Sequence, residues 1–65
     1  MTYTYQQMYD AVDAKAWEQG MAGMTYNELV EFCRVELVKL GMDRTEGAVQ
    51  VASTAHRIAG EYARW

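Results

Sequence analysis

Two helix-start patterns constrain this chain more than any other feature. Thr4 stands three residues before Gln7, and Thr25 stands three residues before Glu28. In a capping box, the threonine oxygen accepts a hydrogen bond from the backbone amide three positions on, and the side chain at that position reaches back to the threonine amide. The sequence therefore predicts that helices begin just after Thr4 and just after Thr25.

A third and weaker start pattern lies in the second half of the chain. Asp43 precedes Glu46 by three positions, but Gly47 occupies the place where an apolar residue would complete the hydrophobic staple. Thr45 is an alternative cap for the same helix. We expect a third helix to begin near residue 44.

Glycines predict where the helices end. Gly20 and Gly41 follow the first two helical segments, and each suits the left-handed position after a helix C-cap. The chain contains no proline that would interrupt a helix. We therefore predict an all-α fold: one compact three-helix domain over residues 1–65, with helices at about 5–18, 26–40 and 44–63.

One alternative remains open at the N-terminus. Residues 2–5 alternate threonine and tyrosine, two residue types that favour strands. A short edge strand before the first helix is the competing interpretation of this segment.

Each predicted helix carries an apolar stripe that is expected to form the core, because residues three and four positions apart share a helix face. The expected core residues are Tyr5, Met8, Tyr9, Val12 and Ala16 in the first helix, Tyr26, Leu29, Val30, Cys33, Leu37 and Leu40 in the second, and Ala48, Val51, Ala52, Ala55, Ile58, Ala59 and Tyr62 in the third. The alanines permit close approach, so the third helix is predicted to be the central packing surface.

The small size of the chain limits the function classes. A chain of 65 residues is expected to expose roughly 4,200 Å² when folded. Burial then contributes about 100 kcal/mol, and ordering the chain costs about the same. These values exclude a second domain and leave little room for a deep catalytic cleft. A single cysteine also excludes an intramolecular disulfide.

Charge and targeting signals narrow the partners. The formal net charge is −3, and residues 1–31 hold five acids against one base, a local charge of −4. Such a balance argues against general binding of nucleic acid or of anionic membranes. No signal peptide and no apolar run of membrane-spanning length is visible in the sequence. We therefore expect a cytoplasmic protein with no membrane association.

Residues that could perform chemistry are few. Cys33 and His56 are the only possible thiolate–imidazole pair, yet Cys33 lies on the apolar stripe of the second helix, where cysteine acts as a small hydrophobe. Asp10 and Asp13 share a helix side without further ligands, which is typical of a solvated face. The sequence predicts no catalytic residue, no metal site and no cofactor, and we expect the protein not to be an enzyme.

Several large side chains fall outside the predicted core stripes. The candidate protein-interface residues are Tyr3, Trp17, Phe32, Val35, Val38, Val49 and His56. Spare apolar residues on every helix of so small a domain indicate a second buried surface. Our leading hypothesis is that Phe32, Val35 and Val38 dimerise the chain or dock a partner. In the alternative, the middle helix is covered on two sides by its own chain.

These observations favour a small, non-enzymatic protein-binding module. We expect an inhibitor or regulator that occludes a protein partner stoichiometrically, and a homodimer. Its length, acidity and small helical architecture resemble those of small phage- and mobile-element-encoded proteins that bind host regulators or defence systems. The alternative function is a small helical DNA-associated regulator, with Arg44, Arg57 and Arg64 as its phosphate contacts.

Overall fold

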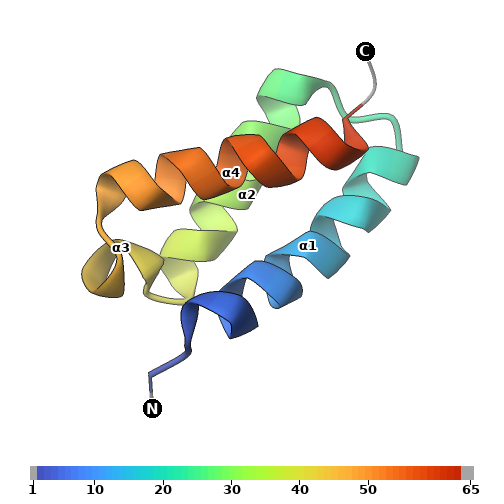
Figure 1. Ribbon diagram of the computed structural model, residues 1–65. Coiled ribbons are helices and arrows are strands. Elements are labelled where there is room, and N and C mark those ends of the chain that lie inside the picture. The colour runs from blue at the N-terminus through green and yellow to red at the C-terminus, as the bar shows by residue number, and fades with distance from the viewer. Residues whose placement is uncertain (1, 64–65) are drawn as a thin grey trace.

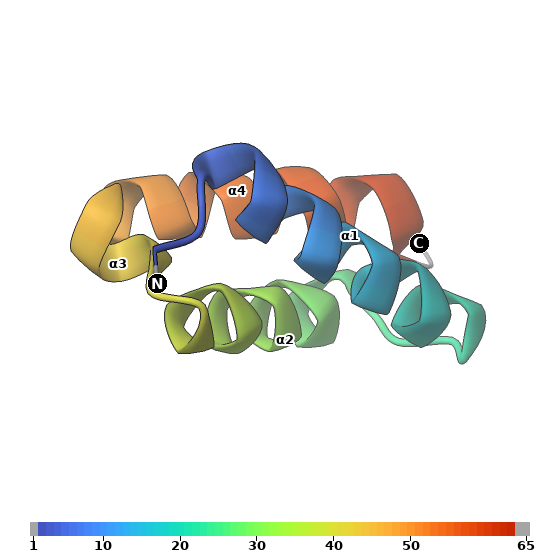
Figure 2. The same cartoon turned by 90° about the horizontal axis from the view of Figure 1, so that it is seen from below.

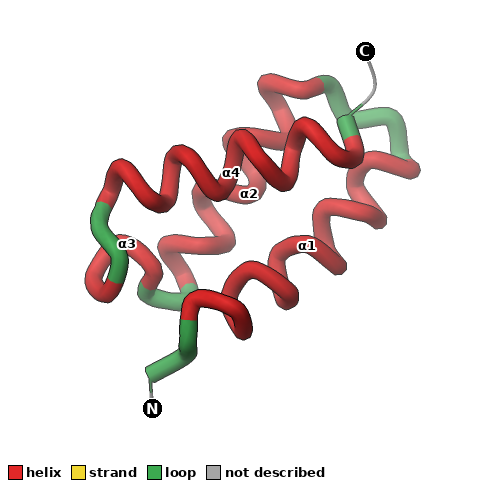
Figure 3. Tube along the Cα trace, in the orientation of Figure 1, coloured by secondary structure: helices red, strands yellow, loops and turns green. Residues whose placement is uncertain are grey.

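The described chain is built from helices joined by short turns. The computed structural model describes residues 2–63, which form α1 (Tyr5–Met21), α2 (Tyr26–Lys39), α3 (Met42–Thr45) and α4 (Ala48–Tyr62). Figure 1 shows their arrangement, and Figure 3 shows that the described part of the trace consists of helices joined by loops and turns. No strand forms within the described residues, so the all-α prediction is confirmed and the alternative of an N-terminal edge strand is wrong.

Both capping boxes are present. The backbone N–H of Gln7 donates to Thr4 Oγ1 at 3.1 Å, and the Thr4 N–H donates to Gln7 Oε1 at 2.9 Å. The corresponding distances at Thr25 and Glu28 are 3.3 Å and 3.0 Å. Hydrogen bonds from the backbone and side chain of Thr25 lower the pKa of the Glu28 carboxyl. The starts of α1 and α2 are therefore fixed by local side-chain chemistry.

The predicted third helix at about 44–63 is wrong at its beginning. Residues 42–45 form the separate helix α3, and α4 begins only after Gly47, whose φ of 92° and ψ of 160° interrupt the helical backbone. Asp43 lies inside α3 and caps nothing, while the Thr45 hydroxyl donates to the Gly41 carbonyl oxygen. Gly47 breaks the helix because a glycine adopts positive φ at no steric cost. Residues 2–63 thus form four helices where three were expected.

The two predicted glycine stops have different outcomes. Gly41 adopts φ of 93° directly after α2, as predicted. Gly20 instead lies inside α1 and is buried, and the left-handed residue after α1 is Gly23. Gly20 is small for a packing reason, because a Cβ built there would lie 2.5 Å from the Tyr62 carbonyl oxygen. The first helix therefore extends one turn further than predicted.

The core lies among the three long helices. α4 packs most extensively against α2, and α1 lies against both. Figure 2 shows α2 on one side and α1 with α4 on the other. The buried apolar residues are Met8, Val12, Ala16, Leu29, Cys33, Leu37, Met42, Val51, Ala55, Ile58 and Ala59. The folded chain exposes 4265 Å², close to the expected surface.

Most of the predicted core stripe residues are buried or packed against the core, with informative differences. Ala48 is exposed at the start of α4, although it was expected in the core. Met42 and Thr54 are buried but were not predicted. Met42 reaches the core because α3 turns the chain back toward α4. Thr54 is accommodated because its Oγ1 lies 3.0 Å from the Tyr5 hydroxyl.

Candidate interaction surface

Large apolar side chains are exposed on each of the long helices and on the N-terminal segment. They are Tyr3, Trp17, Met21, Val35, Val38 and Val49, with between 42% and 81% of each exposed. Scattered exposed apolar residues are ordinary in small proteins, so their grouping decides what they can do. Five of the six are candidate interface residues from the sequence, and Met21 is the addition.

The best-defined apolar group lies on the outer face of α2. Val35 and Val38 stand one turn apart and are each 42% exposed, although α2 packs against both α1 and α4. Although α1 and α4 cover two sides of α2, they leave this face exposed to solvent. Glu31 and Arg34 form an ion pair on the same exposed side of the helix. An apolar centre beside a charged pair is the usual composition of an interface.

Phe32 lies differently from the two valines. Its side chain is part-buried and packs against the core cluster. It therefore supports the fold of α2 and offers only part of its ring to an outside partner. The outward-facing residues that the structure places together on α2 are Val35 and Val38.

A second apolar pair lies near the end of α1. Trp17 and Met21 are four residues apart on one helix, so their side chains are neighbours on its surface. Both are more than half exposed. The sequence interpretation missed Met21 because it ended the first helix before that residue. The i, i+4 spacing would have revealed the pair had the glycine at position 20 been kept within the helix.

The outer face of α4 carries Val49 and His56. Val49 is 81% exposed in the first turn. The His56 Nδ1 lies 2.6 Å from the Tyr26 hydroxyl, and the two ring centroids are 5.7 Å apart. His56 is thereby tied to the beginning of α2, while Val49 has its side chain in solvent.

The possible thiolate–imidazole pair is not assembled. Cys33 is fully buried, and burial together with the nearby Asp13 and Glu36 carboxylates raises the pKa of its thiol to about 11. His56 is exposed and is paired with Tyr26. A buried, protonated thiol is a poor nucleophile. Cys33 acts here as a core residue.

The described part of the chain has no features of a metal site or of a membrane span. Residues 2–63 contain no group of three or more histidine, cysteine, aspartate or glutamate side chains placed to hold a metal ion. None of the helices in these residues combines the length and apolar character needed to cross a membrane.

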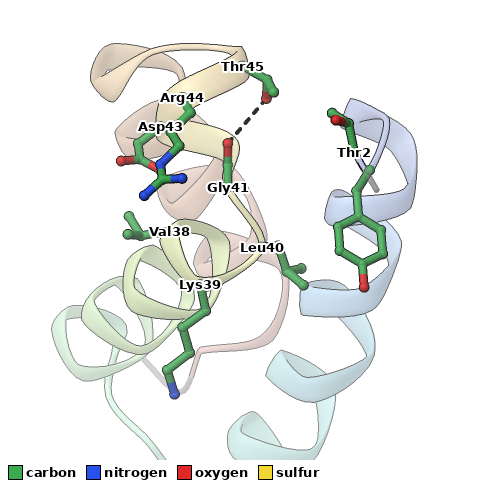
Figure 4. Close-up of a pocket in the computed structure, with 9 residues that line it drawn as sticks. Thr2, Val38, Lys39, Leu40, Gly41, Asp43, Arg44 and Thr45 are labelled. Carbon is green, nitrogen blue, oxygen red and sulfur yellow. Dashed lines mark hydrogen bonds between the residues drawn. The ribbon is translucent and has the colours of Figure 1, made fainter.

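The structure brings three of the sequence candidates to one groove. Tyr3 from the N-terminal segment, Val38 from the end of α2 and Arg44 from α3 line a groove of about 490 Å³. The N-terminal segment lies beside α3 in both ribbon views (Figures 1 and 2), and Figure 4 shows the labelled lining residues around the opening. The remaining lining residues are Thr2, Lys39, Leu40, Gly41, Asp43 and Thr45.

The charges at this groove are unequally paired. Lys39 Nζ donates to Glu36 Oε2 at 3.1 Å, and Lys15 Nζ donates to Glu36 Oε1 at 2.7 Å. These two hydrogen bonds lower the pKa of the Glu36 carboxyl. The side chain of Arg44 makes no hydrogen bond or ion pair within residues 2–63, although its backbone N–H donates to the Gly41 carbonyl oxygen at 3.1 Å. Its guanidinium is thus a cation that the rest of the described chain does not neutralise.

The other arginine candidates lie elsewhere. Arg57 is exposed on α4 and lines a smaller hollow of about 170 Å³ beside Tyr5 and Gln50. Arg64 lies outside the described residues. Arg44 and Arg57 therefore line two different hollows of the structure.

Comparison of the chain with protein families, with curated proteins and with solved structures finds no match.

Proposed function

We propose that this protein is a binding module that inhibits or regulates a protein partner by covering part of its surface. The observation that carries the proposal is the open face of α2, where Val35 and Val38 remain exposed beside a charged pair. Val38 also lines the groove next to Tyr3, so the apolar surface continues from the helix face into the groove. Rigid, partly apolar helix faces of this kind are suited to helix-mediated docking.

We further propose that the chain forms a homodimer centred on Val35 of the α2 face, so that the groove beside Tyr3 and Val38 stays open to the protein partner. An isologous dimer buries the same patch on both subunits, so one residue change removes two contacts. Placing a carboxylate at the centre of an apolar contact leaves it without a counter-charge, which is strongly unfavourable on desolvation. Val35→Asp is therefore the sharpest test of this face.

Light scattering on the whole chain at micromolar concentration provides the measurement. The expected mass is twice the chain mass of 7.4 kDa, and Val35→Asp is expected to give the single-chain mass with an unchanged helical circular dichroism spectrum. Val49→Asp is the matched control, because it adds the same charge at an exposed valine on α4. A dimer that persists in Val35→Asp would place the interface elsewhere, and a monomeric parent chain would exclude the homodimer.

The second candidate function is a small DNA-associated regulator. The unpaired Arg44 guanidinium and the exposed Arg57 are the observations that favour it. Arginine contacts to phosphates weaken as salt rises, because binding releases counterions. A mobility shift of duplex DNA at low salt that is lost in an Arg44→Gln, Arg57→Gln double variant would support this function. No retardation at tens of micromolar protein would exclude it.

A further inference from the structure

The groove between the N-terminal segment and α3 has the form of a small receptor site. Its volume of about 490 Å³ lies within the usual range of ligand pockets, roughly 300 to 1,000 Å³. Gly41 keeps part of its wall open, since a Cβ built there would meet nothing within 4 Å. The φ of 93° at Gly41 strains any other residue at that position. The groove is therefore built into the turn between α2 and α3.

One wall of the groove offers apolar contact. Tyr3 and Val38 are about half exposed, and Leu40 is part-buried between the groove and the core. Tyrosine gives a large contact area at low entropic cost and is enriched among the residues that dominate binding energy. This wall suits a single apolar side chain of an incoming segment.

The groove also has charged lining residues, and most of them are positive. Lys39 and Arg44 carry two positive charges against one negative charge on Asp43, so the lining has a net charge of +1 on a protein of net charge −3. Lys39 is only partly neutralised, because Glu36 is shared with Lys15. Arg44 is unpaired within residues 2–63. The groove is thus a locally cationic site on an acidic protein.

We propose that this groove binds a short, extended acidic segment of the protein partner. A carboxylate of that segment pairs with the Arg44 guanidinium, and a neighbouring apolar side chain packs against Tyr3 and Val38. Arginine is suited to this role because its planar fork donates two parallel hydrogen bonds to one carboxylate. The inference rests on the proposed function, and it adds the chemical class of the recognised segment.

Charge complementarity decides for an acidic peptide and against a nucleic acid. A polyanion must lie along many cations, whereas residues 1–31 carry a net charge of −4 and repel it. A short acidic segment needs only the local cations of the groove. The apolar wall beside those cations also has no counterpart in a phosphate backbone.

The test uses two capped peptides and the whole chain labelled with nitrogen-15. The acidic probe is acetyl-Ala-Asp-Leu-Asp-Leu-Ala-amide, and the matched probe replaces each aspartate with asparagine. Nuclear magnetic resonance titration is expected to shift the amide signals of residues 38–45 with the acidic peptide. The neutral peptide is expected to bind at least about tenfold more weakly, because a charge-assisted hydrogen bond is lost. Raising the salt concentration from about 0.1 M to about 0.5 M is expected to lower the affinity for the acidic peptide, because salt screens the charges.

Arg44→Gln is expected to lower the affinity for the acidic peptide by about tenfold. Arg57→Gln changes the net charge equally and is expected to leave this affinity unchanged. Both residues are exposed, and unchanged amide dispersion verifies the fold. Equal binding of the two peptides, equal loss in both arginine variants, or no shift at residues 38–45 would each overturn the inference. The Val35→Asp mass measurement is independent of this titration. A dimer broken by Val35→Asp together with a groove that binds no acidic peptide would reject the groove alone.

Discussion

Helix α4 meets its two long neighbours through different chemistry. Against α2, the contact is made mainly by buried apolar residues such as Leu37 and Ile58, with one exposed polar pair, Tyr26 and His56, at its edge. Against α1, tyrosine hydroxyls reach across to polar partners at the edge of the core. The three pairs are Tyr5 with Thr54 at 3.0 Å, Tyr9 with Glu61 at 3.2 Å, and Tyr62 with Asp13 at 2.9 Å.

The two contacts differ in what they contribute: apolar burial contributes mainly to stability, and the hydrogen bonds fix the relative position of the helices. Apolar burial scales with area and is indifferent to pH. A hydrogen bond adds only about 1 kcal/mol net, but it fixes geometry and can titrate. We therefore expect the α2–α4 contact to supply most of the stability, and the α1–α4 contact to set the position of α1.

The largest effect is expected in the apolar contact. Leu37→Ala should lower the free energy of unfolding by about 2–5 kcal/mol, through lost burial and the cavity left behind. Val49→Ala, at a residue that is 81% exposed on α4 and lies outside the proposed dimer interface, should change it by at most about 0.5 kcal/mol. Urea denaturation of the two variants measures both values. Similar losses in both would show that burial on α2 does not carry the stability.

The next effect concerns the closest approach between α1 and the end of α4. Gly20→Ala places a Cβ 2.5 Å from the Tyr62 carbonyl oxygen, so the backbones must separate. We expect a loss of about 1–3 kcal/mol from this overpacking, despite the better helix propensity of alanine. Gly60→Ala is the control, because a Cβ there meets nothing within 4 Å. It should stabilise α4 by up to about 1 kcal/mol.

These paired glycines are expected to change the thermal midpoint in opposite directions. The parent chain, Gly20→Ala and Gly60→Ala are compared in one calorimetric series. A stabilising Gly20→Ala would mean that the α1–α4 contact yields easily at this point. The close packing of the two helix backbones would then not be a constraint on the fold.

Gly20 also shows why part of the fold escaped prediction from sequence. A glycine near the end of a helical pattern has two uses, a left-handed stop and a close packing contact, and only the tertiary structure distinguishes them. Thr4 and Thr25 were predictable because their partners lie three residues away in the chain. The two threonine capping boxes are complete within one turn of helix and were predicted correctly, whereas the weaker pattern of Asp43 and Glu46 forms no cap. The role of Gly20 depends on the distant Tyr62 and was not predicted.

The candidate site was also predictable only in part from the sequence. The exposure of Val35 and Val38 follows from their position opposite the core stripe of α2, so their exposure was predictable. The groove was not, because it needs Tyr3 and Arg44 on elements whose meeting depends on the turn at α3. Gly41 and Gly47, both at positive φ, bound the short helix α3 on its two sides. Helical periodicity alone gave no sign of it.

A smaller effect is expected from a single hydrogen bond across α1 and α4. Tyr5→Phe removes the partner of the buried Thr54 hydroxyl and should cost about 1 kcal/mol. Tyr9→Phe removes an exposed hydrogen bond to Glu61 and should cost less. A double-mutant cycle with Thr54→Val isolates the pairwise energy by urea denaturation. A coupling near zero would show that the Tyr5 ring, and not its hydroxyl, holds α1 in place.

The last effect is the loss of one tyrosine–carboxylate hydrogen bond under alkaline conditions. The hydrogen bond that Tyr62 donates to Asp13 Oδ2, with burial and the negative charge of that carboxylate, raises the pKa of Tyr62 to about 12. A tyrosine in the unfolded chain has a pKa near 10. As the pH rises, the unfolded state therefore loses this proton at a lower pH than the folded state does. This contribution to stability is complete below about pH 10 and disappears as the pH rises toward 12.

Denaturation midpoints measured at pH 8, 10 and 11 should therefore fall above about pH 10. The fall should be smaller in Tyr62→Phe, which has no hydroxyl to ionise, and unchanged in Tyr3→Phe, whose side chain is exposed on the N-terminal segment. Part of the fall should remain in Tyr62→Phe, because burial and Glu61 also raise the pKa of Tyr9. An identical alkaline fall in Tyr62→Phe and the parent chain would contradict the pairing with Asp13. The α1–α4 contact would then be as insensitive to pH as the apolar contact between α2 and α4.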